Sequence, residues 1–298
     1  MSYHDPVLLK ESVDGLGIKP NGVYVDVTFG GGGHSREILS RLGPEGKLFA
    51  FDQDEDALAN DIADERFQLI HENFRYVAQF LKFYGVRKVD GILADFGVSS
   101  HQFDKAERGF STRFDAALDM RMSKKNTLSA HDVVNTYSYD DLRRVLFEYG
   151  DLRNANAMAK VIIANREEGA IATTDRLKGV LRQFLPQAKE HKILAQIYQA
   201  IRIEVNQEIE VIKEFLLQVS GLLDKGGRLS MISYHSLEDR LVKRFMRSGK
   251  FEGEAEKDFY GNVTVPFKKV GGLIVPSGQE IKLNNRARSA KLRIAERV

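Results

Sequence analysis

The 298-residue sequence contains no cysteine, no tryptophan and only six prolines. The lack of cysteine excludes disulfides, thiolate metal sites and cysteine nucleophiles, and it fits a reducing cytoplasm, where we expect the protein. No apolar run approaches the roughly 18 residues of a membrane-spanning helix, so we expect no membrane contact. The first ten residues lack a basic segment followed by an apolar one, so we also expect no secretory signal.

A large excess of charge of one sign is also absent. The chain has 44 basic and 42 acidic residues, for a net charge of +2. This balance neither requires nor excludes a nucleic-acid partner, because the distribution of charge decides that question. A hydrophobic share of 43% beside 29% charged residues is typical of a globular protein with a real core.

Between Gly22 and about Val98, short apolar runs alternate with helical patterns, which is typical of βαβ units and a parallel sheet. Each run ends in a polar residue or a turn, so polar groups gather at the carboxyl edge, where open α/β sheets bind ligands. The predicted strands are Val23–Thr28, Lys47–Asp52, Phe67–His71 and Val89–Asp95.

From about Glu107 to Glu210 the strand patterns disappear and apolar residues recur at helical spacing, with one long helix predicted over residues 192–217. A strand pattern returns over 226–235. The sequence therefore predicts an α/β protein whose Rossmann-like domain is discontinuous, formed by residues 1–106 and 211–298. The inserted all-helical domain, residues 107–210, is expected to recognise the substrate.

A glycine run, Gly30 to Gly33, follows the first predicted strand and opens a helix. Glycines allow close approach of backbone to a ligand, although a flexible turn is the alternative. Asp52 ends the next strand, where a carboxylate typically binds ribose hydroxyls. The pair indicates an adenosine-containing cofactor without separating S-adenosylmethionine from NAD. The contiguous glycines and the following His34 favour the methyl donor, which has no pyrophosphate to bind.

Two further residues lie at or shortly after the ends of predicted strands in this half of the sequence. Phe74 is placed to set its ring against adenine, and a packing role in the core is nearly as well supported. Asp95 ends the fourth strand, where the reactive end of the cofactor should lie.

Seven segments stand out in order along the chain: Tyr3–Glu11, Gly30–His34, Asp95–Ser100, Glu107–Ser111, Leu118–Met122, His235–Arg240 and Asn284–Arg293. Together they resemble one known family, the bacterial small-subunit ribosomal RNA cytosine-N4-methyltransferases (the MraW or RsmH family).

The resemblance implies a class I methyltransferase fold, S-adenosylmethionine as methyl donor and no metal requirement. The implied acceptor is the exocyclic N4 of a cytidine in the decoding region of 16S ribosomal RNA, within the small subunit. The oligomeric state stays open, and a homodimer is compatible with the sequence. Carried over by position, the family's cofactor contacts fall on Gly32, Gly33, His34, Asp52, Phe74, Asp95 and Gln102.

The candidate catalytic residues are Asp95, Tyr234 and His235, which all lie at predicted strand ends. The lone pair of the cytosine amine is delocalised into the ring, so an acceptor that holds the amine hydrogens would assist transfer. For His235 a structural role is equally supported, because Ser236 to Asp239 is typical of a capping box with Ser236 as N-cap.

The C-terminal segment carries the candidate RNA-binding residues Arg286, Arg288, Lys291 and Arg293. A solvated face is the ordinary interpretation of such a charge run, but the resemblance favours phosphate contact. One departure from the family is Gln196, which stands where relatives often have arginine, so any RNA contact of that arginine is in doubt. The competing functions are an NAD(P)-dependent oxidoreductase and a non-catalytic RNA-binding or assembly factor.

Overall fold

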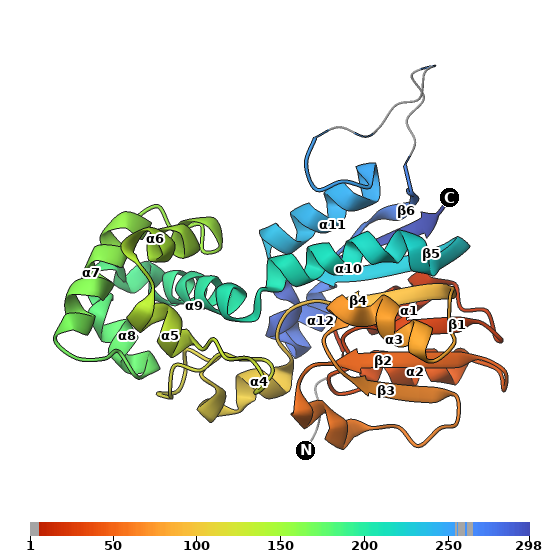
Figure 1. The fold of residues 1–298 in the computed structure, drawn as a ribbon, viewed down its shortest axis with the longest axis horizontal. Coiled ribbons are helices and arrows are strands. Elements are labelled where there is room, and N and C mark those ends of the chain that lie inside the picture. The colour runs from red at the N-terminus through yellow and green to blue at the C-terminus, as the bar shows by residue number, and fades with distance from the viewer. Residues whose placement is uncertain (1–5, 254, 256–259, 261–264) are drawn as a thin grey trace. The chain divides into compact units, whose positions relative to one another are not determined.

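The computed structural model describes residues 6–253, 255, 260 and 265–298 (Figure 1). The start of the motif at Tyr3 lies outside them. The chain divides into two compact units. We call Met1–Gly97 together with Ile209–Val298 the sheet unit, and Val98–Glu208 the helical unit. None of the described helices is both long and apolar enough to cross a membrane.

The sheet unit is built on a seven-stranded sheet, counted over the described residues, in the order β3-β2-β1-β4-β5-β7-β6. Strands β1 to β5 are parallel, and β7 is antiparallel to both β5 and β6. The strands are β1 (Val23–Asp26), β2 (Lys47–Asp52), β3 (Phe67–His71), β4 (Val89–Asp95), β5 (Leu223–Ser233), β6 (Phe267–Ile274) and β7 (Lys291–Arg297). The predicted α/β class and the completion of the sheet by the C-terminal segment are thereby confirmed.

Strand order reverses between β1 and β4, so this sheet has its topological switch point there. In open α/β sheets the crevice for a ligand lies outside the carboxyl ends of the strands at such a point. The residues that follow β1 and β4 are therefore the first place to look for a site.

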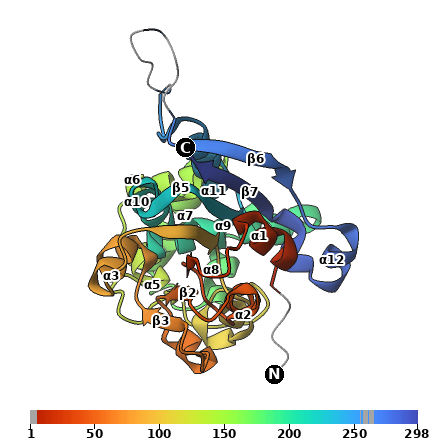
Figure 2. The same ribbon diagram turned by 90° about the vertical axis from the view of Figure 1, so that its right-hand side faces the viewer.

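Helices cover both faces of the sheet (Figure 2). Tyr24 packs with α1 (Leu9–Leu16) and α2 (Gly33–Arg41), whereas its neighbour Val25 faces the opposite layer. That alternation follows from the two-residue period of a strand. The opposite layer consists of α3 (Val77–Phe83), α10 (Glu208–Leu222) and α11 (Ser236–Ser248). Short helical turns, η1 (Glu55–Asn60) and η2 (Phe74–Tyr76), follow β2 and β3.

The two ends of the chain pack together in the sheet unit. Val7 and Leu8 share a hydrophobic cluster with Leu292 of β7. The backbone N–H of Leu8 also donates to Glu280 Oε1 at 2.7 Å, joining residues 272 positions apart. Glu280 lies in α12 (Gly278–Leu283), which is followed by η6 (Asn285–Ser289).

The helical unit has a core of its own. In α6, for example, Leu142, Val145 and Leu146 are buried at helical spacing. Within the described part of this unit, the sole β feature is an isolated bridge between Ala117 and Thr173. The elements are α4 (Ser100–Asp104), η3 (Ala106–Arg108), α5 (Ala130–Thr136), α6 (Tyr139–Glu148), α7 (Ala155–Glu167), α8 (Thr174–Val180), η4 (Arg182–Phe184), η5 (Gln187–Lys189) and α9 (Glu190–Asn206).

The single helix predicted over 192–217 is wrong, because two helices occupy this segment. Helix α9 ends at Asn206 and α10 starts at Glu208. Gln207 between them has φ 51°, a left-handed conformation that terminates a helix. The apolar pattern continues through the break, so periodicity alone could not locate it.

Candidate active site at the carboxyl edge of the sheet

The glycine turn after β1 leads directly into α2. Gly32 is the N-cap of that helix with φ 76°, and no side chain caps the first turn. A Cβ on Gly33 would lie 2.1 Å from Cγ of Pro6, so this position requires glycine. The amide groups at the start of α2 therefore remain available for an anionic group of a ligand.

A buried carboxylate, Asp26, fixes the turn to the helix. Its Oδ2 accepts from Ser35 Oγ at 2.7 Å and its Oδ1 from the Thr28 N–H at 3.1 Å. Burial raises the pKa of Asp26, against the opposing effects of His34 and these hydrogen bonds. Asp26 was not predicted as a site residue, although it ends a strand as Asp52 and Asp95 do.

Asp52 ends β2 and points its carboxylate at the glycine turn. Oδ2 accepts from the Gly30 N–H at 2.7 Å, and Oδ1 accepts from the Asp54 N–H at 2.8 Å. Each oxygen keeps a further lone pair, so the carboxylate is positioned to accept hydroxyl groups. Burial raises the pKa of Asp52 to about 6.

Asp95 ends β4 and lies between two side chains of the sheet unit. Oδ1 accepts from the Tyr234 hydroxyl at 2.8 Å, and Oδ2 lies 4.0 Å from His34 Nδ1. Its backbone N–H donates to Thr28 Oγ1 at 2.7 Å. Burial raises the pKa of Asp95 to about 6, although His34 and Tyr234 act in the opposite direction.

Tyr234 is a hydrogen-bond donor in this arrangement. Burial and the neighbouring Asp95 raise the pKa of its hydroxyl well above 10, so the group stays protonated near neutral pH. Its ring lies against Gly97, where an added Cβ would be 3.2 Å from Tyr234 Cδ2. Gly97 has φ 108°, a conformation that favours glycine.

The ring of His34 bridges the N-terminal segment and Asp95. Its Nε2 lies 3.2 Å from the carbonyl oxygen of Val7. A carbonyl can only accept, so we assign a hydrogen to Nε2, while Nδ1 lies towards the Asp95 carboxylate. His34 therefore has a positional role that the sequence left undecided.

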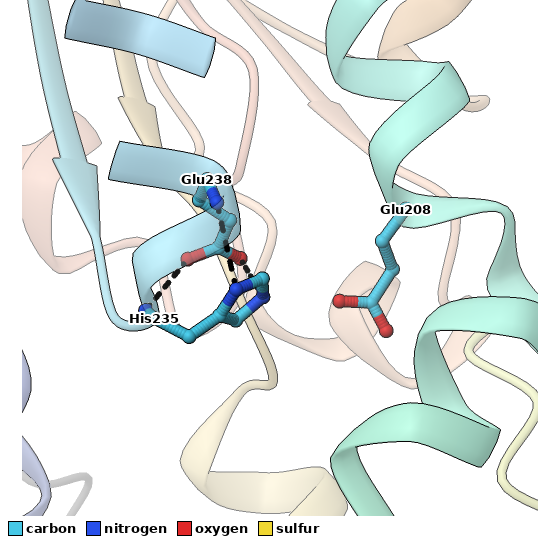
Figure 3. A group of neighbouring side chains, drawn as sticks. All are labelled: Glu208, His235 and Glu238. Carbon is cyan, nitrogen blue, oxygen red and sulfur yellow. Dashed lines mark hydrogen bonds and ion pairs between the residues drawn. The ribbon is translucent and has the colours of Figure 1, made fainter. Parts of the chain in front are cut away.

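His235 begins α11 as its N-cap. Its Nδ1 accepts from the Glu238 N–H at 3.5 Å, and Glu238 Oε2 accepts from the N–H groups of His235 at 3.2 Å and Tyr234 at 2.8 Å. His235 Nε2 and Glu238 Oε1 are 3.0 Å apart (Figure 3). Figure 3 also draws Glu208, which belongs to the helical unit.

The predicted capping box is therefore one residue out of register. Its members are His235 and Glu238, not Ser236 and Asp239. The sequence pattern favoured the Ser236 hydroxyl as the N-cap because serine caps helices more often than histidine does. The structural role of His235 is plain, and its contact with a substrate stays a prediction.

Phe74 belongs to an aromatic cluster next to β3. Its ring centroid lies 6.0 Å from that of Phe96 and 5.4 Å from that of Phe215. The side chain is only partly buried. Core packing thus accounts for the buried part of the Phe74 side chain. The predicted contact with adenine is compatible with its exposed part.

Gln102 lies in the helical unit, within α4. Its Oε1 accepts from the Ser99 N–H, and its own N–H donates to Ser99 Oγ, both at 3.2 Å. This capping box holds the Gln102 side chain, which is 4% exposed. Its contact with a cofactor remains a prediction.

The four basic residues near the C-terminus fall into two groups. Arg286 and Arg288 lie in η6, and Arg288 is exposed. Lys291 and Arg293 lie on β7 and bind Asp239 of α11, with Arg293 Nε to Oδ1 at 2.7 Å and Lys291 Nζ to Oδ2 at 3.4 Å. The second pair therefore has an internal partner that the sequence did not predict.

Gln196 has a local partner in the helical unit. Its Nε2 donates to the carbonyl of Gly150 at 2.9 Å. A backbone contact therefore accommodates the glutamine at position 196. Separately, Arg202 forms a bidentate ion pair with Glu208, with both distances 2.8 Å.

The structure thus gathers Gly32, His34, Asp52, Asp95 and Tyr234 in the sheet unit, around the carboxyl ends of β1, β2, β4 and β5. Carboxylates, a helix start and close-packed glycines suit a ligand with hydroxyl groups, an anionic end and a cationic centre. Each of these residues was predicted from the sequence.

Known proteins resemble the chain along its whole length. A family model, the MraW methylase family, matches residues 1–298. Ribosomal RNA small subunit methyltransferase H of Flavobacterium johnsoniae is 68% identical over 298 residues, which is 100% of this chain and 99% of the relative. The protein of the same name from Flavobacterium psychrophilum is 71% identical over 290 residues, 97% and 100% of the two chains.

A more distant relative of that name, from Bacteroides thetaiotaomicron, is 53% identical over 298 residues, 100% of this chain and 98% of its own. Among solved structures, an rRNA methylase from Streptococcus thermophilus aligns with a TM-score of 0.43 and 13% identity, over 97% of this chain and 95% of its own. That structural similarity is too low to support an argument about function.

Proposed function

Because the chain belongs to the MraW methylase family, as its motifs predicted, we propose that it is a small-subunit ribosomal RNA methyltransferase. It transfers a methyl group from S-adenosylmethionine to the exocyclic N4 of a cytidine in the decoding region of 16S ribosomal RNA. The shared name of the relatives supports the RNA substrate. The identity of the methylated nucleotide and of its N4 acceptor atom is inferred from the family resemblance of the seven segments.

The observation that carries the donor assignment is the set of carboxylates around the glycine turn. Asp52 offers lone pairs to ribose hydroxyls, and the uncapped start of α2 offers amide groups to a carboxylate. Asp95 supplies negative charge where a sulfonium would be stabilised. The residues present therefore fit S-adenosylmethionine.

The chain's own groups can assist the transfer without a metal ion. The sulfonium supplies an electrophilic methyl group, so what remains is placement of the amine at roughly 3–3.5 Å. Asp95 would accept a hydrogen bond from the cytosine amine and draw the nitrogen lone pair towards the methyl. The donor would supply the methyl group as its C–S bond breaks and would leave as S-adenosylhomocysteine, and the amine proton would pass to Asp95 or to solvent as the N–C bond forms.

Tyr234 would act through Asp95. Its hydroxyl donates to Oδ1 and leaves Oδ2 to face the reacting groups. A carboxylate whose pKa is about 6 is ionised near neutral pH, so it can accept the amine hydrogen. His235 caps α11 beside Tyr234 and remains an alternative acceptor.

On the RNA side, Arg286 and Arg288 contact phosphates, together with Lys291 and Arg293, and the helical unit recognises the substrate. A stacked base must be turned out to meet the methyl group. Neutralising Arg286 and Arg288 together should flatten the salt dependence of RNA binding by about 1.5 in log–log slope and leave donor affinity unchanged. An unaltered slope in filter-binding titrations would contradict this contact.

The direct test is methyl transfer from labelled S-adenosylmethionine to small ribosomal subunits that lack the modification. Mass spectrometry of the labelled nucleoside should identify N4-methylcytidine. Another methylated nucleoside would refute the N4 assignment while keeping the donor. Tight donor binding without transfer to subunits or free RNA would favour an assembly factor instead.

A further inference from the structure

Helix α11 carries a row of basic side chains along one face. Its opposite face, with Val242 and Phe245, is buried against the sheet. Positions separated by three, four and seven residues share one side of a helix. We call the row the α11 stripe, and its exposed members are Arg240, Lys243, Arg244 and Arg247.

The acidic residues of α11 do not balance the stripe. Glu238 is fully buried and holds the backbone at the start of the helix. Asp239 binds Arg293 and Lys291. Over the part of the chain that the structure describes, no member of the stripe forms an ion pair, and Arg244 donates to the carbonyl of Phe251.

In other long helices of the sheet unit, charged side chains form ion pairs within the helix or with a neighbouring element. In α2, Arg41 binds Glu37 at 2.6 Å. In α10, Glu214 binds Arg75 at 2.7 Å. Like charges at three- and four-residue spacing disfavour a helix, so the stripe has a cost that its surroundings in the described chain do not offset. The helix dipole favours cations only in the last turn, which does not account for Arg240.

The stripe starts close to the candidate active site. Helix α11 begins two residues after Tyr234, whose hydroxyl binds Asp95. At 1.5 Å per residue, Arg240 and Arg247 lie about 10 Å apart along the helix axis. The row therefore extends away from the site over a distance comparable to a few nucleotides.

We propose that the α11 stripe binds the phosphate backbone of the RNA that flanks the methylated nucleotide. The inference rests on the proposed function, and it adds a surface separate from Arg286 and Arg288. Three of the four residues are arginines, whose planar forks match phosphate oxygens. The complementary partner is a polyanion, and RNA is the polyanion that the proposed reaction brings to this edge of the sheet.

The test compares two triple variants with equal loss of charge. R240Q/K243Q/R247Q removes three members of the stripe and leaves Arg244, which has a backbone contact. The control, K47Q/R87Q/K225Q, removes three exposed cations that lie near the amino ends of β2, β4 and β5. Binding of unmodified small subunits is measured across a salt series, with donor affinity measured by calorimetry to show that each variant is folded.

We expect the stripe variant to bind subunits roughly tenfold or more weakly and to lower the log–log salt slope by about two, with KM for subunits rising in parallel. The control should match the wild type. An unchanged slope and KM in the stripe variant, or an equal loss in the control, would overturn the proposal. Absence of methyl transfer by the wild type would instead refute the proposed function, so the two failures are distinguishable.

Discussion

Carboxylates in the sheet unit occur in two electrostatic settings. At the carboxyl edge, Asp52 and Asp95 accept hydrogen bonds from neutral donors, and neither binds a lysine or arginine among the described residues. On α11, Asp239 binds Arg293 and Lys291. Burial raises the pKa of each residue of the first pair to about 6. For Asp239 burial acts the same way, but the two cations hold its pKa below the usual range.

The presence or absence of a lysine or arginine partner distinguishes carboxylates that could bind a charged ligand from those already neutralised within the protein. A buried negative charge that no lysine or arginine neutralises costs stability, although His34 offsets part of that cost for Asp95. A positively charged ligand would offset more of the cost on binding. A carboxylate that already has its cation gains little from such a ligand. The contrast supports the proposed role of Asp52 and Asp95 in donor binding, whereas Asp239 stabilises the fold.

The largest effect should come from Asp95→Ala. Removing the group that faces the reacting atoms should lower kcat roughly a hundredfold or more at saturating donor. Single-turnover methyl transfer measures the change. If Asp95→Ala and His235→Ala both keep near-normal turnover, then neither residue holds the amine.

Asp52→Asn should weaken donor binding roughly tenfold to a hundredfold, because hydrogen bonds to a charged acceptor are lost. Calorimetry across pH tests the same residue. Wild-type affinity should fall as the pH drops through about 6, where Asp52 becomes protonated, and the variant should lose that part of the dependence.

Ionisation of Asp52 should favour donor binding but disfavour the folded state. The native pKa of Asp52 lies above its unfolded value, so protonation favours the native state between about pH 6 and pH 4. The ionised residue therefore costs stability above pH 6, so wild-type stability should fall as the pH rises from about 4 to about 6, and Asp52→Asn should lose this part of the pH dependence. Urea titrations across this pH range measure it, and an unaltered pH dependence in the variant would contradict the contrast.

Tyr234→Phe should have an intermediate effect, lowering kcat by about tenfold. The Tyr234 hydroxyl lowers the pKa of Asp95, so its removal should move the acidic limb of the kcat profile to higher pH. A purely structural role would reduce stability and leave that limb in place.

Asp239→Asn should have the smallest effect on donor binding, with Kd unchanged, and should reduce stability by about 1 kcal/mol. Because the native pKa of Asp239 is lowered, its contribution is present above the unfolded value near 4 and is lost as the pH falls through the native value. A large rise in the donor Kd of this variant would contradict the contrast between Asp239 and the carboxylates Asp52 and Asp95.

The sequence predicted local features well. Strands β2, β3 and β4 have the predicted bounds. Buried parallel strands are recognisable in a sequence as short apolar runs. In the candidate site, Asp52 and Asp95 were selected because each ends a strand, and the glycine turn because it follows one.

Other features could not be predicted because they depend on contacts between distant segments. Ser35 meets Asp26 only after α2 folds back along β1, and Glu280 meets Leu8 across nearly the whole chain. The break at Gln207 is a backbone conformation that the apolar spacing does not register. The capping box was predicted one residue too late, because the serine next to His235 matches the commoner N-cap pattern.

The pairing of β4 with β5, and of β5 with β7, has a consequence for synthesis of the protein. The glycine turn is translated early, but Tyr234 and its supporting strand come more than a hundred residues later, and β7 ends at Arg297. Such long-range pairing is slow to form. The nascent chain therefore acquires Tyr234, the donor to Asp95 Oδ1, only late in translation, and a fragment that stops before β5 should contain the glycine turn without that hydrogen bond.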